Sequence, residues 1–389
     1  MRPQNSKLYL PRLDQLRFVA AAMVVFSHAW DCFYRNMPVD GLFQLRFRSG
    51  DAGVALFFVL SGFIFTHLAE VSRADSIDYR KFIYNRAVRI FPLLIFMLAI
   101  SFAAQRSHMT PIDMLYPLML MMNSGAALKD GYPMLWSITW TIAVEFQFYL
   151  IFPFLYKFAK AKPVYLVGLI ALLVALRTSA FFASADYASQ MSYLTLPYRI
   201  DQFAFGMLLG FSYNRHLFSS KLRPLLWIAS AGAVVAIAEL YSYQHTLQTE
   251  FGAHVWFSTV EGVLWMAIIA GALSTNILTK GFVGRSLAQL GAASYSLYLV
   301  HLFVILPIAN QIKPLVDWQY LVRDPRVNFA YGIVIGVMLP LAVLLSWFTF
   351  KLVEQPFFQF RTSYFRRNED GAHLRSIKRN ERVPTGTGR

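Results

Sequence analysis

Long apolar runs, separated by prolines, glycines and clusters of charge, dominate the pattern of this chain. A run of about 20 apolar residues is typical of a transmembrane helix, because a helix of that length spans the hydrocarbon core of a bilayer. The pattern predicts ten such helices, near residues 13–31, 52–70, 89–104, 136–156, 164–181, 198–213, 224–242, 256–278, 293–311 and 329–350. The run Pro111–Met122 is too short to span and is predicted to be an interfacial or re-entrant piece. We therefore expect an all-α, polytopic membrane protein with about ten transmembrane helices.

The basic residues of the loops predict how this bundle is oriented. Loops on the cytoplasmic side of a membrane carry an excess of Lys and Arg. Here the basic residues concentrate in alternate loops, around residues 2–12, 73–89, 157–162, 215–223 and 280–285 and from Lys351 onward, whereas the intervening loops hold fewer, Arg177 among them. Both chain termini are therefore expected to be cytoplasmic, and the number of spans is expected to be even.

Composition excludes several classes of protein. With 57% hydrophobic residues, 15% charged residues and a mean hydropathy of +0.45, the chain cannot be an ordinary soluble globule. The net charge of +15 lies in the loops, so it reports membrane topology rather than nucleic-acid binding. The single cysteine, Cys32, excludes an internal disulfide and a cysteine metal cluster, and we expect no metal.

The chain is predicted to form one domain with a tail. Residues 1–360 are expected to be a single integral-membrane domain, whose first span is interpreted as an uncleaved anchor. Beyond Phe360 the chain loses its apolar residues, so residues 361–389 are predicted to be a basic, disordered cytoplasmic tail.

The first predicted helix carries three ionisable residues, Asp14, Arg17 and His28. A charge inside a span costs roughly 2.5–3.5 kcal/mol on insertion scales, so such residues are functional-site hypotheses. Arg17 and His28 lie near one face of the helix and roughly 16 Å apart along its axis. The alternative interpretation is that Arg17 is an interfacial anchor and His28 an interfacial histidine.

Arg86 and Arg89 lie on the predicted cytoplasmic side, ahead of Pro92. Their spacing places them on one face of a helix. Paired guanidinium groups suit phosphate oxygens, so a phosphate-bearing cytoplasmic cofactor is one interpretation. The other is an amphipathic interfacial helix with snorkelling arginines.

The fourth predicted span begins at Trp136 and places Glu145 near its middle. A carboxylate at that depth must be paired, protonated or facing a polar cavity. Trp140 also lies too deep to belong to an aromatic belt at the membrane interface.

Other spans carry polar residues with two open interpretations each. Arg199 and Asp201 near the outer end of the sixth span form either a structural pair or a site. Tyr295, Tyr298 and His301 form a polar stripe in the ninth span, which can line a cavity or satisfy a core histidine. Close helix packing is expected at Ser61, Gly62, Gly206 and Gly210, and Glu354 is expected to cap the last helix.

Together these stretches resemble the integral-membrane acyltransferase-3 family, the bacterial O-acyltransferases that modify surface glycans. The resemblance rests on six motifs in the family's order: Arg17 and His28 with ten residues between them, FFVLSGF at 57–63, NRAVRIFP at 85–92, WSITWTIAVEFQFY at 136–149, RIDQFAFGMLLG at 199–210 and SYSLYLVH at 294–301.

The resemblance implies transfer of an acyl group, commonly acetyl from acetyl-CoA, to a hydroxyl of a sugar outside the membrane. On that hypothesis His28 is the general base, Glu145 orients its imidazole, and Arg17 pairs with Asp14 or reaches the CoA phosphates. The expected donor-binding residues are Arg86, Arg89, Tyr295 and His301, and the expected acceptor-binding residues are Trp136, Tyr149, Arg199 and Asp201. The expected location is a bacterial inner membrane. The expected partners are the bilayer and a glycan or lipid-linked glycan, with polysaccharide-assembly proteins as further candidates and no nucleic acid.

Two other classes of protein compete with this interpretation. A proton-coupled transporter of a lipid-linked sugar or small anion would also use ionisable residues inside the membrane, and a short echo between residues 12–18 and 199–205 would suit an inverted repeat. A non-catalytic subunit of a polysaccharide machine would use the same residues for packing alone.

Overall fold

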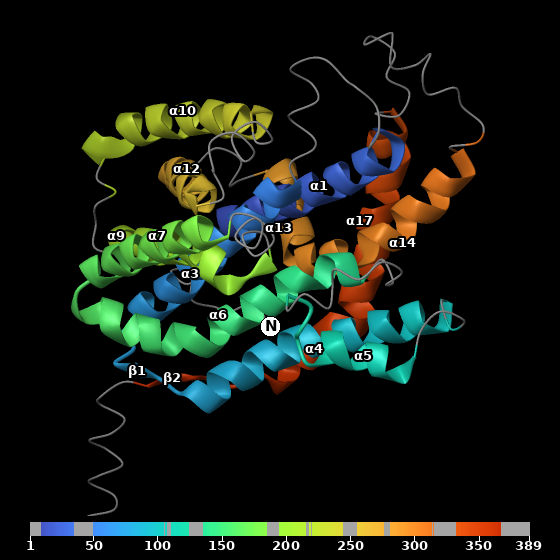
Figure 1. Cartoon of the computed structure of the whole chain (residues 1–389), viewed down its shortest axis with the longest axis horizontal. Helices are drawn as coiled ribbons and strands as arrows, with labels where there is room; N and C mark the ends of the chain where they lie inside the picture. Colours follow the sequence, from blue (N-terminus) through green and yellow to red (C-terminus); the bar gives the residue numbers. More distant parts are fainter. Residues whose placement is uncertain are drawn as a thin grey trace, which may run out of the picture.

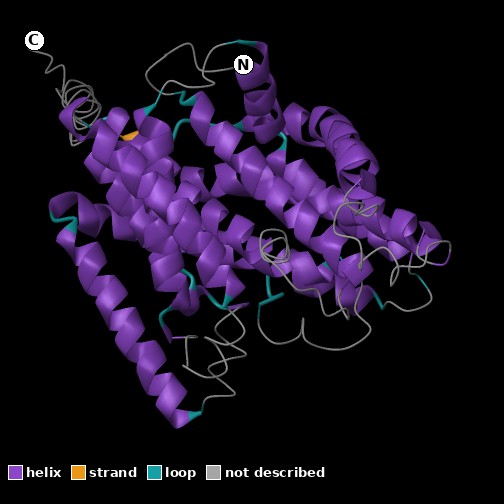
Figure 2. Cartoon of the chain, turned by 90° about the horizontal axis from the view of Figure 1, so that it is seen from above, coloured by secondary structure: helices purple, strands orange, loops and turns teal. Residues whose placement is uncertain are grey.

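A computed structural model describes residues 9–34, 50–104, 106, 110–123, 135–184, 194–214, 218, 220–243, 255–275, 281–312, 314 and 332–366. This part of the chain is almost entirely helical (Figure 2). Its only strands are the two-residue β1 (Ser76–Ile77) and β2 (Phe365–Arg366). The predicted class, an all-α polytopic membrane protein, is confirmed.

Helices occupy all ten positions that the apolar pattern predicted. Nine are α1 (Pro11–Tyr34), α3 (Gly50–Val71), α4 (Tyr79–Ala104), α6 (Trp136–Ala161), α7 (Val164–Ala183), α9 (Ile200–Asn214), α10 (Arg223–Ser242), α12 (Phe257–Ser274) and α14 (Ser294–Ile312). The tenth runs through η6 (Val334–Met338), α17 (Leu339–Thr349), η7 (Phe350–Glu354) and η8 (Gln355–Phe360). Eight of the described helices are long and apolar enough to cross a membrane. The other two are α1, which carries four charged residues, and α9, which has 15 residues.

The structure also differs from the predicted pattern. The amphipathic α13 (Phe282–Ala292), which the pattern did not indicate, packs against α1 just before α14 begins. The predicted interfacial stretch from Tyr79 is continuous with the third span, because α4 runs through Pro92 without ending. The short run after Pro111 forms α5 (Pro111–Leu118). Two further short helices are η2 (Leu196–Tyr198) and η3 (Ser220–Leu222).

Helix α3 packs between α1 and α9 at the centre of the bundle. Helices α10 and α12 lie on one side and α4 and α5 on the opposite side (Figure 1). The close approach of α3 and α9 depends on glycine, as predicted. A Cβ at Gly62 would lie 2.1 Å from the main-chain oxygen of Phe203, and a Cβ at Gly206 would lie 2.0 Å from that of Val59. Small residues let the two backbones touch, and this brings the polar residues of α3 and α9 deep into the bundle.

The described ends of the chain lie on one face of the bundle. Gly50, at the start of α3, packs against Ser27 near the end of α1, so α1 and α3 are antiparallel. Helix α1 therefore begins at the face where α3 ends and β1 follows. Strand β2 pairs antiparallel with β1 at that face, with Ser76 opposite Arg366. We call it the strand face.

Residues 361–366 differ from their predicted disorder. They end in β2 and are held against the start of α4 by two hydrogen bonds between Asn85 and the main chain of Thr362, of 2.6 and 2.9 Å. The described structure therefore continues beyond Phe360 to Arg366, and the remaining part of the predicted tail, 367–389, lies outside the described residues.

Candidate active site

Two histidines from opposite ends of the sequence meet inside the bundle. His28, near the end of α1, and His301, near the middle of α14, are 273 residues apart in sequence. The Nδ1 atom of His28 lies 3.1 Å from Nε2 of His301, and the ring centroids are 5.0 Å apart. His301 is fully buried, whereas His28 is partly exposed. The two rings form a hydrogen-bonded pair in which only His28 has access to open space.

The neighbouring carbonyl groups determine where the protons of this pair lie. Nδ1 of His301 is 2.6 Å from the carbonyl oxygen of Tyr298, and a carbonyl only accepts, so that nitrogen carries the hydrogen. In the neutral ring, Nε2 of His301 is then an acceptor, and Nδ1 of His28 must donate to it. Nδ1 of His28 also lies 3.1 Å from the carbonyl oxygen of Val24, which again requires a donor. Both contacts assign the lone pair of neutral His28 to Nε2, the nitrogen that a general base needs.

His28 lines a cavity of about 210 Å³, which we call the histidine pocket. Its walls come from α1, α3, α6 and α14, and they include Asp31, Asp51 and Trp140. The lining is mainly polar, and this distinguishes the pocket from a lipid-facing groove. A polar hydroxyl compound could reach His28 here.

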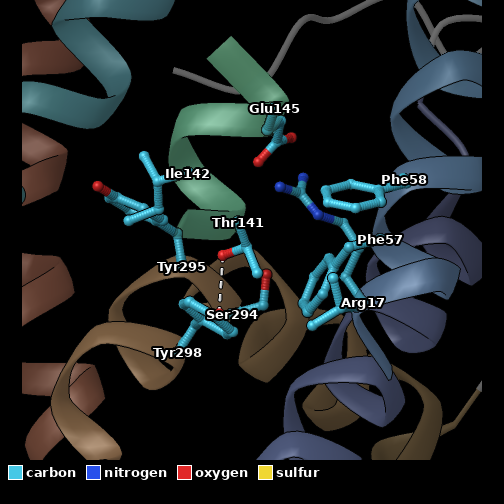
Figure 3. A pocket seen from close by; sticks show the side chains of 10 residues that line it. Arg17, Phe57, Phe58, Thr141, Ile142, Glu145, Ser294, Tyr295 and Tyr298 are labelled. Atoms are coloured by element: carbon cyan, nitrogen blue, oxygen red, sulfur yellow. Dashed lines mark hydrogen bonds between the residues drawn. The ribbon is translucent and has the colours of Figure 1, made fainter. Parts of the chain in front are cut away.

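A second, narrower cavity of about 40 Å³ lies deeper toward the strand face, and we call it the carboxylate pocket. Figure 3 shows the guanidinium of Arg17 extending across it toward Glu145. Val54 and Tyr298 line both pockets, so the two cavities are neighbours that share a wall. Arg17 and His28 lie on the same helix, α1, and each lines one of the two adjoining cavities.

Glu145 has partners that differ from the sequence hypothesis. Its carboxylate accepts hydrogen bonds from the hydroxyls of Ser61, at 2.7 Å, and Tyr149. The group that contacts the His28 imidazole is His301. Ser61, for which helix packing was expected, thus also bonds a half-buried acid.

Arg86 and Arg89 lie on α4 near the strand face, where both side chains are half-buried among aromatic rings. The guanidinium carbon of Arg86 lies 4.9 Å from the centre of the Phe65 ring and 5.9 Å from that of Tyr149. Arg89 lies 4.0 Å from Glu354. Within the described residues, Nε of Arg86 and Nη2 of Arg89 are buried and have no hydrogen-bond partner. Buried donors of native proteins are normally satisfied, so these two point to a missing acceptor.

Glu354 is more than the helix cap that the sequence suggested. It is 1% exposed, accepts a hydrogen bond from Ser296 on α14, and faces Arg89. It lies at the end of η7, a π-helical turn, and such turns are frequent at functional sites. Tyr295, the residue before Ser296, lines the carboxylate pocket and donates a 2.9 Å hydrogen bond to the carbonyl of Ile90 on α4. Tyr295 therefore lies between the carboxylate pocket and the helix that carries the two arginines.

Arg199 and Asp201 do not pair with one another. Asp201 lies 2.8 Å from Arg177 of α7, and Arg199 lies 3.6 Å from Glu261 of α12. Arg177, which the sequence analysis counted with the outer loops, is 2% exposed inside the bundle. All four residues are buried, so they hold α7, α9 and α12 together. The guanidinium of Arg199 also lies 5.9 Å from the ring centre of Trp140, which lines the histidine pocket.

The structure thus groups most of the predicted site residues along one polar path. His28 and His301 lie at one end, Arg17, Glu145, Tyr149 and Tyr295 lie around or beside the carboxylate pocket, and Arg86 and Arg89 lie toward the strand face. The side chain of Trp136 lies outside the described residues. Sequence analysis missed Glu261, although an acid inside the apolar run 257–274 was a sufficient signal.

An all-α bundle with apolar spans, and with polar cavities and ionisable residues in its interior, defines a membrane protein with a candidate site inside the bundle. Residues 10–351 match the family model described as an acyltransferase domain. The chain belongs to the acyltransferase-3 family. No solved structure matches the chain.

Several curated proteins are similar to this chain. Nodulation protein 10 of Rhizobium leguminosarum bv. viciae is 24% identical over 93% of this chain and 98% of its own length. Acyltransferase MdmB of Streptomyces mycarofaciens is 27% identical over 76% of this chain and 79% of its own length. Peptidoglycan O-acetyltransferase OatA of Listeria monocytogenes is 26% identical over 77% of this chain, a match that spans 50% of OatA. The protein is a membrane acyltransferase by family.

Proposed function

We propose that this protein transfers an acyl group, acetyl in the first instance, from cytoplasmic acyl-CoA to a hydroxyl of a cell-surface or secreted glycan across the bacterial inner membrane. The observation that carries the proposal is the polar path from Arg86 and Arg89 to His28. It joins a cationic site at one face to a candidate base deeper in the bundle. The names of similar proteins, among them a peptidoglycan O-acetyltransferase, support a glycan as acceptor.

The donor enters from the strand face in this scheme. Arg86 and Arg89 bind phosphate oxygens of CoA with donors that have no partner in the described protein. Arg17 and His28 are roughly 16 Å apart along α1, a distance that an extended pantetheine arm covers. The narrow carboxylate pocket lies between them and widens to admit the arm when the donor binds.

The acceptor hydroxyl lies in the histidine pocket and attacks the carbonyl carbon of the thioester. Nε2 of His28 takes the hydroxyl proton as the C–O bond forms. The C–S bond then breaks, the sulfur leaves with its electron pair, and the proton on His28 passes to that sulfur. The products are the acyl ester and CoA with a free thiol, so atoms and charge balance.

The remaining polar residues position these groups. His301 holds His28 in the tautomer with a free Nε2 and accepts from the imidazolium that forms during attack. Glu145 and Arg17 line the carboxylate pocket together, where the negative charge of Glu145 favours the charged form of Arg17. The Arg199 and Asp201 ion pairs fix α9 and, through Trp140, one wall of the histidine pocket.

The test is mass spectrometry of surface glycans from a strain that lacks the gene, complemented with the wild type or with His28→Ala. We expect an acyl mass to disappear in the deletion strain and to return only with the wild type. His67→Ala is the matched control, because His67 binds Asn214 near the strand face and lines neither pocket. It is expected to support acylation in proportion to its abundance in the membrane.

Two results would contradict the proposal. Normal acylation by His28→Ala at wild-type abundance would remove the proposed base. Unchanged acylation in the deletion strain, with a glycan or its precursor accumulating inside the cell, would favour the transporter instead.

A further inference from the structure

The segment 361–366, which we call the clasp, lies beside Arg86 and Arg89 of α4. It follows the last span and packs against the start of α4. Tyr364 of the clasp packs its ring 5.3 Å from that of Phe82, and the guanidinium of Arg86 lies 5.9 Å from the Tyr364 ring centre. At the end of the clasp, Arg366 forms an ion pair with Asp78. The clasp is therefore attached at three points: the Asn85 hydrogen bonds, the Tyr364 ring and the ion pair of Arg366.

Arg361, the first residue of the clasp, lies beside the two arginines of α4. Its guanidinium carbon is 3.7 Å from the centre of the Phe358 ring, and that of Arg89 is 5.2 Å from the same ring. One aromatic ring thus contacts two cations from different segments. Nε of Arg361 is buried and has no hydrogen-bond partner within the described residues, as is true of Nε of Arg86 and Nη2 of Arg89.

The charge of this cluster is not balanced within the described part of the chain. Glu354 is the only carboxylate in ion-pair range of the three arginines among the described residues, at 4.0 Å from Arg89, so three positive charges and one negative charge leave an excess of two. Burial, followed by repulsion from Arg89 and Arg86, lowers the pKa of Arg361 to about 9. At neutral pH the guanidinium still carries its charge, so the repulsion remains until an anion binds.

We propose that Arg361 completes a three-arginine phosphate site with Arg86 and Arg89, and that the clasp holds it there to bind a phosphate of the acyl-CoA donor. The ligand class follows from the donors: three forked, planar guanidinium groups with unpartnered N–H groups match phosphate oxygens. The inference rests on the proposed function, because acyl-CoA is the phosphate-bearing substrate of that reaction. It adds a residue from the far C-terminal end of the domain to a site otherwise built on α4.

The experiment is a comparison of two ligands with the full-length protein in nanodiscs of zwitterionic lipid. CoA carries phosphates, and pantetheine carries none. We expect Arg361→Gln to weaken CoA binding roughly 10- to 100-fold, the range for a lost charge-assisted hydrogen bond, and to leave pantetheine binding unchanged. Arg361→Lys, which keeps the charge without the fork, is expected to recover part of the loss. Arg80→Gln is the matched control, since Arg80 is an exposed arginine on the same helix as Arg86.

Four outcomes overturn the inference. Equal loss of CoA and pantetheine binding in Arg361→Gln would show a structural role for the clasp. Unchanged CoA affinity in Arg361→Gln, with normal binding by the wild type, would remove Arg361 from the site and leave the proposed function intact. A defect that appears only when anionic lipid is added to the nanodisc would assign the site to a phospholipid headgroup. Failure of the wild type to bind CoA would overturn the proposed donor and this inference together.

Discussion

The histidine pair makes the sharpest prediction, through the substitution His301→Phe. Phenylalanine keeps a planar ring in a fully buried position and removes the Nε2 acceptor that faces Nδ1 of His28. Nδ1 of His28 still donates to the Val24 carbonyl, so the ring stays near its present place. The substitution therefore removes the hydrogen bond to the base, together with the bond from Nδ1 of His301 to the carbonyl of Tyr298 on its own helix.

The size of the effect follows from the charge that His28 acquires. When Nε2 takes the acceptor proton, the imidazolium donates a charge-assisted hydrogen bond to His301, and such bonds contribute about 1.5–3 kcal/mol. Losing it raises the barrier by that amount and lowers kcat roughly 10- to 150-fold. His28→Ala removes the base itself and is expected to lower kcat about 10²- to 10⁴-fold. The KM for acyl-CoA should change little in His301→Phe, because the proposed phosphate site of the donor lies near the strand face.

The assay is acyl transfer in proteoliposomes with acetyl-CoA and an acceptor glycan, normalised to the amount of folded protein. His301→Gln is the conservative control, because its amide oxygen can accept from Nδ1 of His28 and should restore part of kcat. The double variant His28→Ala, His301→Phe should be no slower than His28→Ala alone, since residues that act as one unit are not additive. Additive losses, or a normal kcat in His301→Phe, would refute the role of His301 as a positioning residue.

Three further predictions concern stability. Arg177→Met leaves the buried Asp201 carboxylate without its cation and should lower the free energy of unfolding by about 3–5 kcal/mol. The measurement is thermal unfolding in detergent, and a loss below about 1 kcal/mol would contradict the buried ion pair. Gly62→Ala places a methyl group 2.1 Å from a main-chain oxygen of α9 and should lower the free energy of unfolding by about 1–3 kcal/mol. The control Gly168→Ala has open space around it and should leave the free energy of unfolding almost unchanged. Equal effects of the two substitutions would mean that α3 and α9 can separate freely. The hydrogen bond from the clasp holds the pKa of Asp78 below its ordinary value, so the stability from this contact is present above the unfolded pKa of about 3.9 and is lost as pH falls through the lower folded pKa. The protection factor of the clasp amides, which corrects for the intrinsic pH dependence of hydrogen exchange, should therefore fall in acid. A protection factor that does not change with pH would show that the ion pair does not retain the clasp.

The candidate site was only partly predictable from the sequence. Intramembrane ionisable residues identified Arg17, His28 and Glu145 as members of a site, because charge is costly in lipid wherever the helix packs. The same rule could not assign partners. Arg199 and Asp201 are two residues apart in sequence, yet each pairs with a different helix, and Glu145 bonds Ser61 and Tyr149 rather than the His28 imidazole.

The sequence by itself determined the positions of the ten long apolar helices, because hydropathy is a local property and a span of the bilayer needs a fixed length of apolar chain. It also determined which helices carry charge. Only the tertiary structure decided that His301 contacts His28 and that the clasp, expected to be disordered, returns to α4. These contacts join segments 273 and 277 residues apart, and their distances depend on how close the helices between them can pack. That packing is set by glycine contacts and buried ion pairs across the bundle, which no local pattern along the chain reports.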